Sequence, residues 1–185
     1  MSWQLNRKIF LYIIPFLVLL ILGVLFMFQL ITKHDPYQIQ SVLIGKQFPE
    51  VNLPPLMQGK DGLDSRKLKG KMFLINIFAS WCAPCIAEHK ILMRLKKEGI
   101  LIKGISYKDD INDSIAFIEE NGNPYDSIGV DGDGRFGIEL GMYGIPETFV
   151  LDYKSIIRYR HAGQITDDLL EKELMPLIKK LKYEN

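Results

Sequence analysis

Hydrophobic residues follow two different patterns along the chain, a long uninterrupted run near the start and alternating short runs afterwards. The first run extends from Ile9 to Ile31 and contains 23 residues without a charge. At about 1.5 Å per residue, a helix of this length crosses a hydrocarbon core of roughly 30 Å. The run ends in QLITKHDP, which lacks a small-residue cleavage site, so we expect an uncleaved anchor and not a signal peptide.

Charges on either side of the run predict its orientation. Arg7 and Lys8 precede it, whereas Lys33 is followed by His34 and Asp35. Because cationic residues accumulate on the cytoplasmic side of a span, the C-terminal part of the chain is expected to face outward. The predicted parts are a cytoplasmic N-terminus, a transmembrane anchor, a tether and a folded domain, at residues 1–8, 9–31, 32–43 and 44–185.

The folded domain alternates between short apolar runs and segments of helical periodicity. The predicted strands are Lys71–Phe78, Ile100–Tyr107, a short strand in YDSIGVD, Glu147–Asp152 and a hairpin strand in SIIRYRHAG. The predicted helices are Ala83–Glu98, a segment that ends at Gly122, Arg135–Leu140 and a closing helix, Thr166–Lys182, kinked at Pro176. Alternation of strands with helices indicates an α/β domain that contains a parallel sheet.

Composition narrows the possible partners. The chain has 23 Lys and Arg residues against 22 Asp and Glu residues, for a net charge of +1. Proteins that bind nucleic acid through its phosphates carry a basic patch or stripe. This balance offers no such stripe, so we expect no nucleic-acid partner.

Cys82 and Cys85, the chain's two cysteines, follow the first predicted buried strand. As a structural staple, a disulfide across two intervening residues stabilises little, because it closes a very short loop. A metal site completed by His89 is an alternative without a visible fourth ligand, and two inert core residues are another. Unpaired amides and the dipole at a helix N-terminus stabilise a thiolate. We therefore predict a redox pair, with Cys82 at the exposed helix end as the attacking thiol and Cys85 as the resolving thiol.

The residues around the pair support this interpretation. Pro84 suits the first helical turn, where a missing N–H costs nothing, and Trp81 is expected to shield one side. WCAPC at a strand-to-helix turn resembles the active site of the thioredoxin superfamily. In YGIPETF, Pro146 matches the cis-proline that faces the cysteines in that superfamily. The resemblance implies a cis Ile145–Pro146 bond beside a groove for a substrate peptide.

The anchor, WCAPCIAEH, GNPYDSIGVDGDGRFGIELGMYGIPETF and IIRYRHAG together resemble the DsbE/CcmG proteins of cytochrome c biogenesis. The resemblance implies an α/β, thioredoxin-like fold with an inserted strand-helix unit, preceded by one N-terminal transmembrane helix. The insertion accounts for the additional elements between Cys85 and Pro146. The implied location is the bacterial inner membrane, with a single span and the C-terminal domain in the periplasm.

The same resemblance implies a function and its partners. The protein would be a thiol:disulfide reductase that reduces the CxxCH disulfide of apocytochrome c, or acts on another haem-maturation component. A membrane thiol transporter of the DsbD or CcdA type would supply the electrons. No cofactor is implied beyond a redox-active disulfide between Cys82 and Cys85, and no metal.

Two glutamates are candidates for tuning the thiols. Asn76 occupies the strand position of a buried aspartate in thioredoxin, and the resemblance suggests Glu88 and Glu147 as replacements. A nearby carboxylate disfavours a thiolate and makes the dithiol a better reductant. Glu88 is equally compatible with a solvated helix position. Arg158 and Arg160 alternate along a strand and are expected on its solvated face.

Two further functions are compatible with the same motifs. One is a TlpA-like general periplasmic thiol reductase with other clients. The other is a non-catalytic protein that carries copper or docks apocytochrome. The molecules that become covalently held by Cys82 distinguish these three functions.

Overall fold

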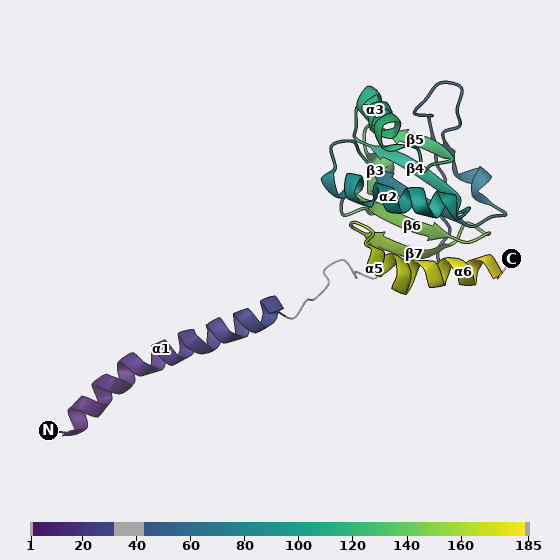
Figure 1. Cartoon of the computed structure of the whole chain (residues 1–185). Helices are drawn as coiled ribbons and strands as arrows, with labels where there is room; N and C mark the ends of the chain where they lie inside the picture. Colours follow the sequence, from purple (N-terminus) through teal and green to yellow (C-terminus); the bar gives the residue numbers. More distant parts are fainter. Residues whose placement is uncertain (1, 32–42, 184–185) are drawn as a thin grey trace. The chain divides into compact units, whose positions relative to one another are not determined.

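The computed structural model describes residues 2–31 and 43–183 (Figure 1). The chain divides into two compact units, Met1–Pro36 and Tyr37–Asn185. Except for its last residue, the predicted tether at 32–43 lies outside the described residues.

The first unit contains one helix, α1 (Ser2–Ile31). Its segment Tyr12–Gln29 has a mean hydropathy of 2.5, and none of that segment is buried. By length and composition α1 can cross a membrane, which is consistent with a single-pass anchor.

The second unit is built on a five-stranded sheet with the order β5-β4-β3-β6-β7 (Figure 1). Its strands are β3 (Phe73–Phe78), β4 (Ile102–Tyr107), β5 (Ser127–Asp131), β6 (Glu147–Leu151) and β7 (Ile157–Ala162). Strands β3, β4 and β5 are parallel, whereas β6 pairs antiparallel with β3 and with β7. The apolar run of β3 is buried at every position, as expected of a central strand with both faces covered.

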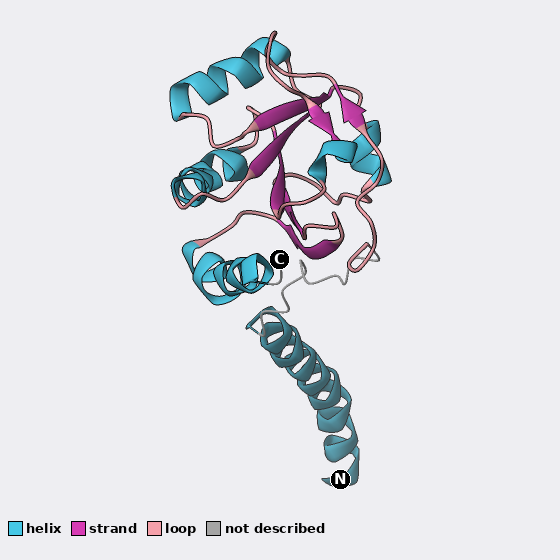
Figure 2. Cartoon of the chain, turned by 90° about the vertical axis from the view of Figure 1, so that its right-hand side faces the viewer, coloured by secondary structure: helices cyan, strands magenta, loops and turns pink. Residues whose placement is uncertain are grey.

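Helices lie on both faces of this sheet (Figure 2). Helices α2 (Ala83–Lys97) and α3 (Ile111–Asn121) pack on one face together with the C-terminal helices, over an apolar cluster that includes Leu74 and Val150. The short helix α4 (Arg135–Glu139) packs on the other face, where Phe136 joins a second cluster. The elements between α2 and β6 are therefore β4, α3, β5 and α4, which confirms the predicted strand-helix insertion.

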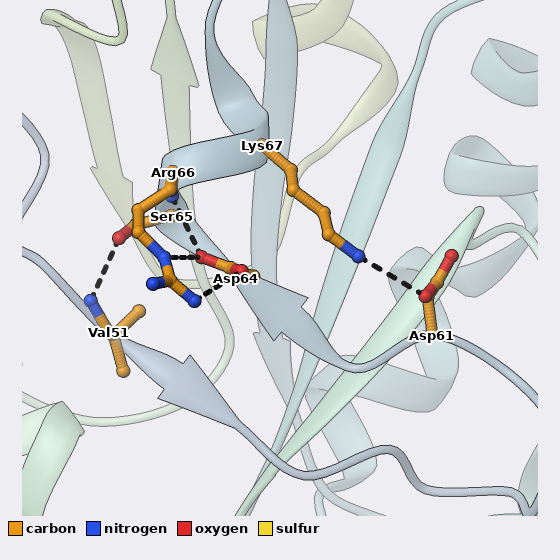
Figure 3. Close-up of polar contacts among 6 residues, drawn as sticks. All are labelled: Val51, Asp61, Asp64, Ser65, Arg66 and Lys67. Atoms are coloured by element: carbon orange, nitrogen blue, oxygen red, sulfur yellow. Dashed lines mark hydrogen bonds and ion pairs between the residues drawn. The ribbon is translucent and has the colours of Figure 1, made fainter.

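A small hairpin precedes the main sheet and was not predicted. Strand β1 (Asn52–Leu53) pairs antiparallel with β2 (Leu63–Asp64), and the 3-10 helix η1 (Ser65–Leu68) follows directly. Asp64 caps η1 by accepting the Arg66 N–H at 3.0 Å and also binds the Arg66 guanidinium (Figure 3). The Ser65 hydroxyl accepts the N–H of Val51 at 2.9 Å and fixes the hairpin to η1 (Figure 3).

The N-terminal segment of this unit also covers parts of both sheet edges. Beside β5, Leu56 N–H donates to Ile128 O at 3.1 Å, and Val130 N–H donates to Pro54 O at 2.9 Å. At the start of β7, Gly45 N–H donates to Ile157 O at 2.7 Å. Backbone groups that edge strands would otherwise expose are thus paired at these positions.

The C-terminal helix differs from the prediction of one kinked helix. It consists of α5 (Asp167–Leu169), the π-helical segment η2 (Leu170–Leu174) and α6 (Met175–Tyr183). Pro176 lacks an N–H, and its ring clashes with the carbonyl four residues earlier in a regular α-helix. The wider π turn directly before Pro176 accommodates the proline.

Candidate active site

The two cysteines lie at the N-terminus of α2 and form a disulfide with a Cα–Cα distance of 5.2 Å. Cys82 is the N-cap residue, in an extended conformation, and Pro84 follows in the first turn. The Cys85 N–H points at Cys82 Sγ, with a distance of 3.2 Å. One backbone amide and the N-terminal end of the helix dipole are thus directed at the Cys82 sulfur, as the predicted attacking thiol requires.

The burial of Cys82 differs from the prediction. Cys82 is 3% exposed, whereas the neighbouring Trp81 is 61% exposed. Both sulfurs belong to the apolar cluster beneath α2, and Ile145 packs against this cluster. Cys82, at the helix terminus, is therefore part of the core, against which Ile145 of the loop before β6 also packs. The Trp81 indole lies outside and donates its N–H to Lys108 O at 3.3 Å.

The Ile145–Pro146 peptide bond is cis, as the resemblance implied. Pro146 directly precedes β6, and its carbonyl accepts the N–H of Gly163 at 2.8 Å. Ile145 packs against the apolar cluster to which Cys82 and Cys85 belong, so the two predicted halves of the site border the same cluster.

Glu88 lies one turn after Cys85 and has no solvent exposure, which rules out its interpretation as a solvated helix residue. Its Oε1 accepts from Asn76 Nδ2 at 2.8 Å, and its Oε2 accepts from the backbone N–H of Ile165 at 2.7 Å. Burial raises the pKa of Glu88 to about 7, although its two hydrogen bonds favour the charged form. A carboxyl group that titrates near neutral pH therefore lies within one helical turn of the redox pair.

Asn76 connects Glu88 to two other buried side chains. Its Nδ2 also donates to Thr148 Oγ1 at 3.0 Å, and its Oδ1 accepts from the Tyr125 hydroxyl at 2.8 Å. Burial, together with the nearby Glu88 charge, raises the pKa of Tyr125 well above its ordinary value. The Asn76 amide, at the strand position where thioredoxin has a buried aspartate, thus organises a polar network on the α2 face of the sheet.

Glu147 occupies a different environment. Successive side chains of a strand point to opposite faces, and Thr148 contacts Asn76 on the α2 face. Glu147 therefore points to the opposite face, where it forms a buried ion pair with Arg160. Burial raises the pKa of Glu147, and the Arg160 guanidinium opposes that shift. The two candidate glutamates are thus on opposite faces, and the structure does not bring them together.

Arg160 contradicts the prediction of a solvated strand face. Its side chain is 6% exposed, because the β6–β7 pairing places it beside Phe149 on the same face as Glu147. Arg158 is more exposed and forms an ion pair with the buried Asp152 at 2.9 Å. The pairing of β6 with β7 shifts register between Val150 and Leu151, beside Arg158, and the assignment of the strand face to solvent was wrong for Arg160.

Sequence reasoning also missed a carboxylate beside the active-site loop. Asp109 accepts hydrogen bonds from the Ser80 N–H at 2.7 Å and the Ser80 hydroxyl at 2.8 Å. It also accepts from the buried Ser114 hydroxyl at 2.6 Å. These bonds join the segment before Cys82 to the start of α3. The signal in the sequence is weak, because KDD after a strand reads equally well as a helix cap.

His89, the third ligand of the alternative metal site, is buried. Its Nε2 lies 2.8 Å from Gly122 O, and its ring packs edge-on against Phe117. Burial lowers the pKa of His89. Within the described ranges, no cluster of three or more His, Cys, Asp or Glu side chains has an arrangement suited to a metal ion.

Comparison with known proteins decides the family. Residues 43–174 match the Redoxin family. The thiol:disulfide interchange protein DsbE of Yersinia pestis is 42% identical over 171 residues, which cover 90% of this chain and 91% of that protein. DsbE of Escherichia coli (strain K12) is 40% identical over 183 residues, with 97% and 98% coverage. The chain belongs to the DsbE family of thiol:disulfide interchange proteins.

Solved structures show the same fold as in this DsbE-family chain. A secreted thiol-disulfide isomerase from Corynebacterium glutamicum superimposes with a TM-score of 0.62 at 23% identity, covering 79% of this chain and 96% of that one. A thioredoxin-like protein from Porphyromonas gingivalis gives a TM-score of 0.60 at 27% identity, with 75% and 94% coverage. The predicted thioredoxin-like fold and DsbE resemblance are confirmed. The chain is a thiol:disulfide oxidoreductase.

Proposed function

We propose that this DsbE-family protein acts as a reductase on the CxxCH disulfide of apocytochrome c, so that haem can be attached. The observation that carries the proposal is the buried Glu88 carboxyl one helical turn from the Cys82–Cys85 pair. When ionised, this group opposes formation of a nearby thiolate. The reduced pair is then less stabilised, which makes the dithiol a stronger electron donor.

The proposed exchange has two steps. The Cys82 thiolate attacks one sulfur of the client disulfide, which forms a mixed disulfide and releases the other client sulfur as a thiolate that takes up a proton. Cys85, after loss of its proton, then attacks Cys82 Sγ and releases the second client thiolate. Two electrons pass to the client, and the Cys82–Cys85 disulfide of the structure is the product.

Glu88 is suited to hold a proton during this cycle. Its pKa of about 7 allows both protonation states near neutral pH. Asn76 and the Ile165 N–H fix the orientation of the carboxyl group beneath α2. In this proposal, Glu88 accepts the Cys85 proton as the second step begins and releases it once the disulfide has formed.

The proposed location is the bacterial inner membrane, with α1 as a single span and the second unit in the periplasm. The apolar window of α1 and the cationic residues Arg7 and Lys8 before it support this placement. Reduction of the Cys82–Cys85 disulfide requires a dithiol donor, for which we propose a membrane thiol transporter of the DsbD or CcdA type.

Trapping of the mixed disulfide tests the function. Cys85→Ser removes the resolving thiol, so a client attacked by Cys82 stays covalently bound and can be purified from native membranes and identified. The matched control is Cys82→Ser, which should hold no client. Apocytochromes with CxxCH motifs are expected. Unrelated exported proteins would instead indicate a general reductase, and bound copper without an adduct would indicate the non-catalytic alternative.

A further inference from the structure

One side chain of β7 contacts the segment that carries the cis-proline at three separate points. This segment, residues 141–147, is called the proline loop here. Arg160 Nη2 donates to Gly141 O at 2.7 Å at the start of the loop. The guanidinium carbon lies 4.9 Å from the ring centroid of Tyr143 in its middle. Arg160 Nε donates to Glu147 Oε1 at its end.

The Arg160 guanidinium is largely buried, with 6% of its side chain exposed. Glu147 has no solvent exposure, and the Phe149 ring centroid lies 5.4 Å from the Arg160 guanidinium carbon. A buried cation destabilises a protein unless it is paired and hydrogen bonded, and here both conditions are met. The planar fork of arginine can bond two acceptors while its face stacks on an aromatic ring, which the ammonium group of lysine cannot do.

The loop held by Arg160 borders the apolar cluster that contains the redox pair, and it is also exposed to solvent at Tyr143. Ile145 packs against the cluster that contains Cys82 and Cys85, so the loop and the disulfide share one apolar cluster. Tyr143 is exposed, although its ring is in contact with Arg160. An aromatic side chain with one supported face and one free face is well suited to contact a polypeptide.

We propose that Arg160 is a positioning residue for thiol:disulfide interchange, which holds the proline loop at the distance from Cys82 that a bound polypeptide disulfide requires. It acts through Tyr143, Ile145 and Glu147 without touching the reacting sulfurs. The inference rests on the family's interchange activity and not on apocytochrome c as the client. Its signature is a loss of polypeptide recognition with retained reactivity toward disulfides too small to use the loop.

The test measures how fast the full-length reduced protein, in detergent micelles, reduces three oxidised probes. They are a CxxCH peptide, the same peptide with its His replaced by Ala, and hydroxyethyl disulfide. Arg160→Gln is expected to lower kcat/KM by about tenfold for both peptides, mainly through KM, since displacement of positioned groups by about 1 Å costs up to a hundredfold. The rate with hydroxyethyl disulfide is expected to stay within about twofold of the unmodified protein.

Two further variants separate positioning from stability. Arg158→Gln removes a guanidinium that is also paired with a buried carboxylate, Asp152, at the opposite end of β7, and should leave all three rates unchanged. Arg160→Lys keeps a cation beside Glu147 but loses the fork that reaches Gly141, so it should stay folded and still show a raised KM for both peptides.

Several results would overturn the inference. They are unchanged peptide KM values in both Arg160 variants, an equal slowing with all three probes, or the same peptide loss in Arg158→Gln. The apocytochrome proposal is tested separately, by comparing the rates at which the unmodified protein reduces the two peptides. Equal rates for those peptides count against CxxCH selectivity and leave the Arg160 result intact.

Discussion

Asn76 and Glu88 share a 2.8 Å hydrogen bond that joins the central strand β3 to helix α2 beneath the redox pair. Both residues are fully buried. The bond orients Glu88 but does not compensate fully for the loss of hydration, because the pKa of Glu88 is still raised to about 7. The Glu88 proton therefore affects the stability of the fold and, in the proposed mechanism, the redox exchange.

The first prediction concerns stability against pH. Glu88 titrates at about 7 when folded and near 4.5 when unfolded, so the folded state binds more protons between these values. The unfolding free energy should therefore fall as pH rises from about 4.5 to 7, by on the order of 3 kcal/mol from this group alone. Urea unfolding of the oxidised unit Tyr37–Asn185 at a series of pH values measures this slope.

Glu88→Gln should remove most of that slope. The variant also loses one acceptor, because the amide nitrogen of glutamine cannot accept the N–H of Ile165, which costs about 1–3 kcal/mol at every pH. Glu119→Gln, at an exposed position on α3, is the matched control and should retain the slope. An undiminished slope in Glu88→Gln would assign the pH dependence to other groups.

The second prediction concerns the order of thiol reactivity in the reduced protein. Cys82 caps α2 and has the Cys85 N–H directed at its sulfur, whereas Cys85 lies inside the first turn. Cys82 should therefore react faster with iodoacetamide, by about tenfold. Mass spectrometry of peptides after brief labelling measures the ratio. Preferential labelling of Cys85 would reverse the assigned roles.

The third prediction concerns Asp109. Asp109→Ala removes the acceptor for Ser80 and Ser114 and should destabilise the unit by about 1–3 kcal/mol. It should also loosen Trp81, which is the single tryptophan of Tyr37–Asn185 because the other is Trp3. Reduced fluorescence anisotropy and a shifted emission maximum report this change.

Asp110 provides the control for that measurement. It is the N-cap of α3 and accepts the N–H of Asn112 at 2.8 Å, so Asp110→Ala should cost about 1 kcal/mol. Trp81 emission should be unaffected by Asp110→Ala. Equal fluorescence changes in the two variants would mean that Asp109 acts through α3 as a whole.

The fourth prediction concerns the buried ion pair. Glu147→Gln leaves the Arg160 cation buried without its partner, which should cost about 3–5 kcal/mol of unfolding free energy. The double variant Glu147→Gln, Arg160→Gln removes both charges and should recover part of this loss. Urea unfolding of the single and double variants measures the coupling. Additive losses would show that the two side chains do not depend on each other.

The same substitution tests whether Glu147 affects the redox pair. The remaining Arg160 cation favours a thiolate, so the reduction potential of Glu147→Gln should rise, by roughly 30 mV for each 1.4 kcal/mol of thiolate stabilisation. A glutathione redox titration measures the change. Because Glu147 and Arg160 neutralise each other, the double variant should return close to the original potential. An unchanged potential in Glu147→Gln would leave Glu147 with a role in the loop only.

The features that could be predicted from sequence depend on local pattern. The buried run of β3, the helix that begins after Cys82 and the proline before β6 each have a signal within a few residues. The strand-helix insertion was predictable because the segment between Cys85 and Pro146 is long enough to hold additional elements.

The features that sequence reasoning missed depend on contacts between distant segments. Arg160 is buried because the loop after α4 folds over it, and nothing in the alternation of β7 encodes that loop. Cys82 is likewise buried in a cluster assembled from distant segments, among them Leu74 of β3 and Val150 of β6. Glu88 could not be assigned to the core from periodicity alone, because its partners, Asn76 and the Ile165 N–H, come from β3 and from the segment after β7.

The pairing of the N-terminal segment with both sheet edges has a consequence for folding and solubility. Gln47 bonds to Lys154 O across 107 residues of sequence, so this part of the edge can close only after nearly the whole unit has been made. Contacts this distant form slowly, since loop closure precedes any gain from them. Until then the flanks of β5 and β7 can pair with other chains. A shortened form that begins after Leu56 should therefore aggregate, even though its cysteines and proline loop are intact.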